Sequence, residues 1–149
     1  MTEFKSSNFL IPISSENRRL KELKFNMYIK SSTTNHLGKW NVNIVNSTGE
    51  KTYLNGTNIN TTNDRVTLFG IIEGLKHLLN QYSILDQKHL KINCFTDNIY
   101  CSNVIKEWIN IWKKEGFINR PNSDLLTHCN TMINNCNFNI NYIPLVNDI

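Results

Sequence analysis

The sequence predicts an α/β domain in which helices pack on a mixed β-sheet. Three short segments with strand periodicity follow one another closely, and a long amphipathic segment then leads to a fourth strand. Two further helical segments precede a fifth strand. Close turns favour antiparallel pairing, whereas a strand reached through a helical crossover lies parallel to the strand it joins. The predicted order is therefore βββαβααβ, an α/β layer on a mixed sheet.

The first three strands form a predicted antiparallel meander within a domain that covers residues 25–149. Residues 1–24 show little periodicity and are interpreted as an extension that docks on the domain or on a partner. The segment "KFNMYIKSS" is a short strand, and "KWNVNIVN" places Trp40, Val42 and Ile44 on alternate positions, as a half-buried strand requires. The turn "STGEK" then leads to "KTYLNGTN" as the third strand.

The clearest helix is "TTNDRVTLFGIIEGLKHLLNQY", which Thr61, Thr62 or Asn63 can cap. Its apolar residues form two adjoining stripes, and a face that wide packs against a sheet. The strand "HLKINCFTD" follows and ends on Asp97. Because a helical crossover precedes it, we expect this strand to lie parallel to the first.

Two more helices and a last strand complete the pattern. The helix after Asp97 carries Cys101, Ile105, Trp108 and Trp112 on one side, and Gly116 is a natural stop. The segment "NSDLLTHCNTMINNC" predicts a short helix capped by Asn122 or Ser123. The segment "NFNINYIPL" predicts the final strand.

Size and composition fit one soluble intracellular domain. The chain has 149 residues, of which 40% are hydrophobic and 10% aromatic, enough for a packed core. No apolar run approaches the ~20 residues that cross a bilayer, so no membrane partner is expected. The C-x6-C spacing is longer than in usual zinc knuckles, which favours reduced, buried thiols over a zinc site. The cysteines are Cys94, Cys101, Cys129 and Cys136.

The charge is mildly basic. A net charge of +4 and a pI near 8.9 permit contact with phosphates without requiring it. Asparagine makes up about a sixth of the chain, for which an A+T-rich genome is a simpler cause than a functional code. Cytoplasmic, viral and organellar settings fit this composition equally.

Four motifs in order carry a resemblance to a known family. The segments "TTNDRVTLFGIIEGL", "FTDNIY", "WINIWKKEGF" and "NSDLL" resemble those of the type 1 ribonuclease H family. The similarity covers about residues 25–146. It implies a ribonuclease H-like fold, a five-stranded sheet with helices on both sides.

The resemblance also implies where catalytic carboxylates belong. The family cleaves the RNA strand of RNA–DNA hybrids with two divalent metals held by four acids. The first acid falls on Lys30, the second on Thr67 and the third on Asp97. The fourth belongs to a C-terminal helix beyond the last strand, and we expect that helix to be absent because this sequence ends first, at Ile149. The family's histidine loop also has no histidine here. One carboxylate offsets two divalent ions poorly, and a unit charge at about 4 Å changes the energy by roughly 4 kcal/mol at an effective dielectric near 20.

We therefore expect an inactive site without a metal, in which Asp97 bonds to Lys30 or to nearby hydroxyls. Mg²⁺ or Mn²⁺ would be cofactors only if rearranged ligands preserved activity. Four acids considered for such a rearrangement are Asp64, Glu73, Asp124 and Asp148.

Substrate-contact positions are better preserved than the acids. Thr62, Asn63 and Arg65 match the segment that lies against the hybrid's minor groove in the family. Four further residues match the family's basic protrusion, which meets the phosphates of the DNA strand: Trp108, Trp112, Lys113 and Lys114. Structural roles are the alternatives, because tryptophans at this spacing are often core residues, lysines favour a helix C-terminus and asparagine favours an N-cap.

Three functions stay open. The first is an inactive structural or assembly module with protein partners in a larger nucleic-acid-processing or ribonucleoprotein complex. The second is a module that binds RNA/DNA duplexes without cutting. The third is an active, metal-dependent ribonuclease H with rearranged ligands. An exposed apolar patch would favour the first function, a continuous positive face the second and three converging acids the third.

Overall fold

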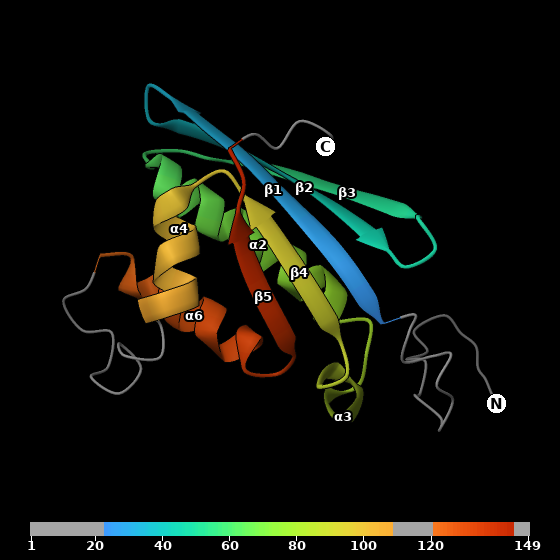
Figure 1. Ribbon diagram of the computed structural model, residues 1–149. Coiled ribbons are helices and arrows are strands. Elements are labelled where there is room, and N and C mark those ends of the chain that lie inside the picture. Colours follow the sequence, from blue (N-terminus) through green and yellow to red (C-terminus); the bar gives the residue numbers. More distant parts are fainter. Residues whose placement is uncertain (1–22, 109–120, 145–149) are drawn as a thin grey trace.

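A five-stranded mixed sheet is the centre of the computed structural model, which describes residues 23–108 and 121–144 (Figure 1). The strand order is β3-β2-β1-β4-β5. The first three strands pair antiparallel, and β4 and β5 extend the sheet in parallel from β1, which confirms the predicted meander and crossover. The strands are β1 (Lys24–Thr34), β2 (Leu37–Asn46), β3 (Lys51–Asn58), β4 (Lys91–Thr96) and β5 (Asn137–Tyr142). The predicted extension lies outside the described residues except for its last two.

The described helices cover one face of this sheet. Helix α2 packs on β1, β2 and β3, and it also contacts α4 and α6, so the three helices share a layer (Figure 1). Among the described residues no helix packs on the opposite face, where the resemblance implies a second layer. The helices are α2 (Asn63–Leu79), α3 (Ile84–Gln87), α4 (Ile99–Asn103), the π-helical turn η1 (Val104–Trp108) and α6 (Ser123–Ile133).

Contacts between β1 and α2 fix the direction of the helix. Every second residue of β1 lies against α2 about one turn nearer the helix N-terminus than the last: Met27 at Gly74, Ile29 at Gly70, Ser31 at Thr67 and Thr33 at Asn63. The helix therefore runs antiparallel to β1 and begins at the carboxyl end of that strand. Because side chains alternate along a strand, the even-numbered residues of β1 face away from α2.

Some of the helices begin at the capping residues that the sequence predicts, and others do not. Thr62 caps α2, and its Oγ1 accepts a hydrogen bond from the Arg65 backbone N–H at 3.3 Å. The short helix α3 was missed in the sequence, although Ser83 followed by Asp86 is a capping pattern, and Ser83 Oγ accepts from the Asp86 N–H at 3.2 Å. After β4 the predicted single helix is instead a short α-helix followed by a π-helical turn, and residues 109–120 lie outside the described part.

The cysteines belong to the core, as predicted. Cys94, Cys101 and Cys129 are buried and Cys136 is half-buried, each as a free thiol. Burial raises the pKa of all four, to about 12 for Cys129 and about 11 for Cys136, so they stay protonated at neutral pH. None of the described helices is long and apolar enough to cross a membrane.

Candidate functional site

The candidate site lies where the carboxyl ends of β1 and β4 meet the beginnings of α2 and α4. Ile29 and Thr96 are the last pair in the parallel register of β1 and β4, so Lys30 and Asp97 follow it on adjacent strands, as predicted. Lys30 is exposed and Asp97 is half-exposed. The even position of Lys30 in β1 turns its side chain to the face away from α2, whereas Thr67 lies on α2 beneath the sheet.

The prediction that Asp97 bonds to Lys30 or to nearby hydroxyls is wrong for the part of the chain that the structure describes. Within residues 23–108 and 121–144, no hydrogen bond or ion pair joins Asp97 to Lys30 or to a hydroxyl. The physical reason is exposure, because a hydrated ammonium gains little from an ion pair at a surface and loses side-chain entropy in forming it.

A neutral hydrogen-bond network centred on Thr67 occupies this edge instead. Thr67 Oγ1 donates to the Asn63 carbonyl at 2.8 Å and lies 2.7 Å from Ser31 Oγ. Because a hydroxyl has one hydrogen, Ser31 must donate in the second bond. Asn98 Nδ2 donates to the same oxygen at 3.3 Å. Thr67 is fully buried, so this hydroxyl has its complete set of partners inside the protein.

Asn98 connects the network to the next helix and to an acid. Its Nδ2 also donates to Asp64 Oδ1 at 2.9 Å, and its Oδ1 caps α4 by accepting from the Cys101 N–H at 3.0 Å. Its backbone N–H donates to Thr96 Oγ1 at 3.1 Å. With only 7% of its surface exposed, Asn98 holds the ends of β4, α2 and α4 together.

The donor set at this edge does not fit two divalent ions. Among the described residues, no group of three or more His, Cys, Asp or Glu side chains lies close enough to hold a metal. The hydroxyls and the amide already bond to one another and bring no negative charge themselves, and one carboxylate, Asp64, is bonded to them through Asn98. Mg²⁺ and its relatives need carboxylates in such sites, because clustered negative charge offsets the charge of the ions.

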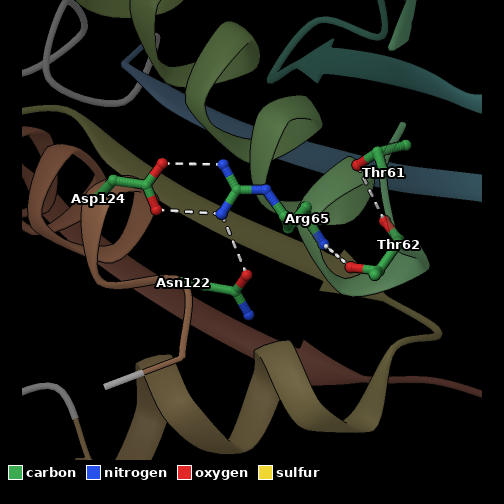
Figure 2. Close-up of polar contacts among 5 residues, drawn as sticks. All are labelled: Thr61, Thr62, Arg65, Asn122 and Asp124. Carbon is green, nitrogen blue, oxygen red and sulfur yellow. Dashed lines mark hydrogen bonds and ion pairs between the residues drawn. The ribbon is translucent and has the colours of Figure 1, made fainter. Parts of the chain in front are cut away.

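Arg65 is the predicted nucleic-acid residue with the most defined contacts. Figure 2 shows its guanidinium forked on Asp124, with Nη1 donating to Oδ1 at 3.0 Å and Nη2 to Oδ2 at 2.8 Å. Nη1 also donates to Asn122 Oδ1 at 3.3 Å (Figure 2). The hydrogen bond from Arg65 lowers the pKa of Asp124 to about 2, and the same bond raises the pKa of Arg65. Bidentate pairing orients this arginine toward α6.

Asn122 holds an unusual position for a helix cap. It precedes α6 with a left-handed backbone (φ 60°), and its side chain makes no cap bond. Its Oδ1 receives Arg65, and its Nδ2 donates to the Tyr100 hydroxyl at 3.2 Å. The predicted cap position is therefore correct, but the side chain joins α2, α4 and α6 instead of capping.

The other predicted nucleic-acid residues are only partly described. Asn63 is exposed at the first turn of α2 and accepts from Thr33 Oγ1 at 3.4 Å, while the capping role belongs to Thr62. Trp108 ends η1. Trp112, Lys113 and Lys114 lie outside the described residues. The structure thus places Asn63 and Arg65 on the first turn of one helix and leaves the predicted protrusion untested.

Sequence reasoning missed Ser31, Asn98 and the Arg65–Asp124 pair. Ser31 had a signal, because Phe25, Met27 and Ile29 alternate as buried residues and the next position in that series is residue 31. Asn98 also had one, as an asparagine directly before a helix is a preferred cap. The pair between Arg65 and Asp124 joins residues far apart in sequence, and no local pattern indicates it.

Comparison with known proteins agrees with this architecture. A family model described as RNase H matches residues 24–144. A ribonuclease H from Legionella pneumophila (strain Corby) is 34% identical over 82 residues, which are 55% of this chain and 51% of the relative. A ribonuclease H from Wolbachia sp. subsp. Drosophila simulans (strain wRi) is 40% identical over 62 residues, covering 42% of this chain and 37% of that one. The chain spans about half the length of the curated Legionella relative.

Solved structures show the same fold at low sequence identity. LC9-RNase H1, a type 1 RNase H with the type 2 active-site motif, superposes with a TM-score of 0.66 at 15% identity, over 80% of this chain and 63% of that chain. RNase H1 from the halophilic archaeon Halobacterium salinarum NRC-1 gives 0.62 at 11% identity, over 81% and 86%. Because the RNase H model matches residues 24–144, most of the sequence, this chain belongs to the ribonuclease H family.

Proposed function

We propose that this chain is a non-cleaving member of the ribonuclease H family. The observation that carries the proposal is the neutral network of Ser31, Thr67 and Asn98 at the edge where the resemblance places metal-binding acids. A divalent ion there would have to displace bonds among buried groups and would receive no compensating charge from them. Lys30, at the position of the first acid, adds positive charge at the same end of β1.

Cleavage of a labelled RNA–DNA hybrid in Mg²⁺ or Mn²⁺ tests this proposal. We expect no products beyond those of a blank without protein. Asp97→Asn is the matched control, because it removes the one family acid that the sequence retains without changing its size. Hydrolysis by the unmodified chain that disappears in Asp97→Asn would overturn the proposal, whereas hydrolysis unchanged in that variant would indicate a contaminating nuclease.

Metal binding gives a second, independent readout. Titration of the protein with Mn²⁺, followed by water-proton relaxation, should show no site tighter than about millimolar, the weak end of the range for cation sites in proteins. A site lost in Asp97→Asn would contradict the proposal even if no cleavage were seen.

The role we propose for the domain is that of a module within a nucleic-acid-processing or ribonucleoprotein complex. Its family and its net charge of +4 support this role. Association with protein partners belongs to the same proposal. Native mass spectrometry of the chain purified from its own source should show it bound to other subunits, and a chain isolated only as a free monomer would contradict the assembly role.

A second candidate is binding of RNA–DNA hybrids without cleavage. Asn63, exposed on the first turn of α2, favours it, since the resemblance places this residue against the minor groove. Arg65 gives less support because Asp124 already occupies its fork. Anisotropy of a labelled hybrid at two salt concentrations tests binding. Lys113→Ala and Lys114→Ala each remove one expected phosphate contact, so each should reduce the slope of log affinity against log salt concentration by about 0.9. Unchanged slopes would exclude phosphate contacts from these two lysines.

A further inference from the structure

The two faces of the sheet differ in what their side chains offer. Contacts of Met27, Ile29 and Ser31 with α2 define the inner face. We call the opposite side of the five strands the outer face. It consists of the even-numbered residues of β1 and of the residues in register with them. Among residues 23–108 and 121–144 no helix packs on it.

The charge of the outer face has one sign along the strands. All the lysines in the strands lie on this face by register, and each is exposed. They are Lys24, Lys30, Lys39, Lys51 and Lys91. None of the five strands contains an aspartate or a glutamate. Inside the strands these lysines have no acidic neighbours, whereas just outside them Asp97 follows β4 beside Lys30 and Glu50 precedes Lys51. The remaining excess of positive charge, which lies toward both ends of β1, favours an anionic partner.

Aromatic side chains occupy the middle of the same face. Tyr28 and Phe95, on neighbouring strands, stack with their ring centroids 5.0 Å apart and their planes 16° from parallel. Both are half-buried. The register places Asn43 and then Tyr53 in the same cross-strand row. Asn43 is buried, with 1% exposed, whereas Tyr53 is 59% exposed. Flat rings on an exposed sheet are platforms on which nucleic-acid bases stack.

Asparagine amides surround this aromatic row on every strand. The outer-face members include Asn26, Asn41, Asn55, Asn93 and Asn139. Amides both donate to and accept from the edges of bases. Leu37 and Val45, near opposite ends of β2, are the aliphatic side chains that the strands contribute to this face, so an amphipathic helix would find little continuous apolar surface there. The exposed apolar patch that would favour a scaffold is therefore not found here.

We propose that the outer face binds single-stranded nucleic acid. The bases stack on Tyr53 and on the Tyr28–Phe95 pair, and the lysines at either end of β1 contact the phosphates. A single strand fits better than a duplex, because in a duplex the faces of the bases are covered by their neighbours. This site lies on the face opposite α2 and meets the candidate site at Lys30, but it requires neither cleavage nor hybrid binding.

Fluorescence anisotropy of the full chain with a labelled oligo(dT) and an oligo(rU) of about 15 nucleotides tests the proposal. We expect binding at low salt that weakens as salt rises, with a slope of about −0.7 per contacted phosphate. The double variant Lys30→Gln/Lys91→Gln should bind about tenfold more weakly, with a smaller slope. Lys76→Gln/Lys106→Gln is the matched control, since it removes the same charge from exposed positions on the helices.

Variants of Tyr53 distinguish the contribution of base stacking to affinity from the contribution of charge. Tyr53→Ala should weaken binding by about tenfold at every salt concentration, while Tyr53→Phe keeps the ring and restores affinity. Both variants must keep the thermal midpoint of the unmodified chain, which the exposure of Tyr53 favours. No binding at low salt, equal losses in the helix-lysine control, or tight binding unaffected by Tyr53→Ala would each overturn the proposal. A hybrid competitor that fails to displace the strand would support a site distinct from the α2 edge.

Discussion

Ser31 Oγ and Thr67 Oγ1 lie 2.7 Å apart and join the first strand to the first helix. The contact lies at the sheet edge where the resemblance to ribonuclease H places metal-binding acids. Thr67 is completely buried, and each of its hydrogen-bonding sites is used within the protein. The edge therefore has the character of a structural core made from polar groups, and its stability can be measured separately from any catalysis.

Replacing Thr67 with valine should destabilise the protein by about 1–3 kcal/mol, because the change keeps the shape but removes the shared partner of Ser31 and Asn98. Urea unfolding measures the effect. Thr131→Val is the matched control, since Thr131 is exposed and its hydroxyl bonds only to the Thr127 carbonyl. A loss below 0.5 kcal/mol in Thr67→Val, about the size of an ordinary surface substitution, would show that the network adds little to stability.

The Arg65–Asp124 pair should make stability depend on pH in acid. The pKa of Asp124 in the folded protein is about 2, below its ordinary value of 3.8, because Arg65 bonds to it. A lowered pKa stabilises the fold above about pH 4, and this stabilisation is lost as pH falls from about 4 to 2. Since the carboxylate is 64% exposed, we expect only about 0.5–1 kcal/mol.

Urea midpoints between pH 2 and 6 measure this contribution, and Asp124→Asn should flatten the acid limb by the same amount. Glu73→Gln is the comparison, because Glu73 makes a single 3.5 Å ion pair with Lys76 on the same helix, α2. Equal flattening in both variants would assign the effect to net charge and not to the fork.

The cysteines should differ sharply in their reaction with thiol reagents. Cys136 is half-buried with a pKa of about 11, whereas Cys94, Cys101 and Cys129 are fully buried. Because the thiolate is the reactive form, we expect slow modification of Cys136 in the folded protein and protection of the other three until unfolding. Mass spectrometry after alkylation at pH 8, with and without urea, distinguishes them. Rapid modification of Cys94 in the native state would contradict this packing.

Gly38 should tolerate no side chain. A Cβ built on this residue would collide with the Val66 side chain and lie 2.8 Å from Thr61 Cγ2. Val66 is fully buried and has no room to move, so Gly38→Ala should cost about 1–3 kcal/mol in urea unfolding. Gly70→Ala is the control, because its closest contact would be 3.2 Å to Ile29 and alanine favours the helix. Equal effects at both positions would contradict the collision.

The sheet and the main helix could be predicted from sequence because their signals are local. Trp40, Val42 and Ile44 alternate along one strand, and all three are buried against α2 in the structure. Thr62 as the cap of α2 follows from the same kind of short-range chemistry. Aligned motifs placed Thr67 and Asp97 at one end of the sheet, and the contact of Thr67 with Ser31 and the register of β1 and β4 agree.

The side-chain partners at the site could not be predicted, because they depend on which face each residue occupies. Alignment placed Lys30 at a ligand position, yet it is Ser31 that contacts Thr67. A shift of one residue along a strand moves a side chain to the other face. Arg65 was interpreted as a phosphate contact, but tertiary packing brings Asp124 from α6 to its guanidinium. Only coordinates reveal such a pairing.

The order β3-β2-β1-β4-β5 has a consequence for how the chain folds as it is synthesised. The meander closes early because its turns are local, but β1 becomes a central strand only when β4 arrives, as Ile29 pairs with Thr96. Until then β1 is an exposed edge on a nascent chain, a state prone to mispairing with other strands. Pairing across such a sequence separation is slow because the loop must first close. Docking of β4 beside β1 is thus the step at which this protein passes from a local hairpin assembly to its final topology.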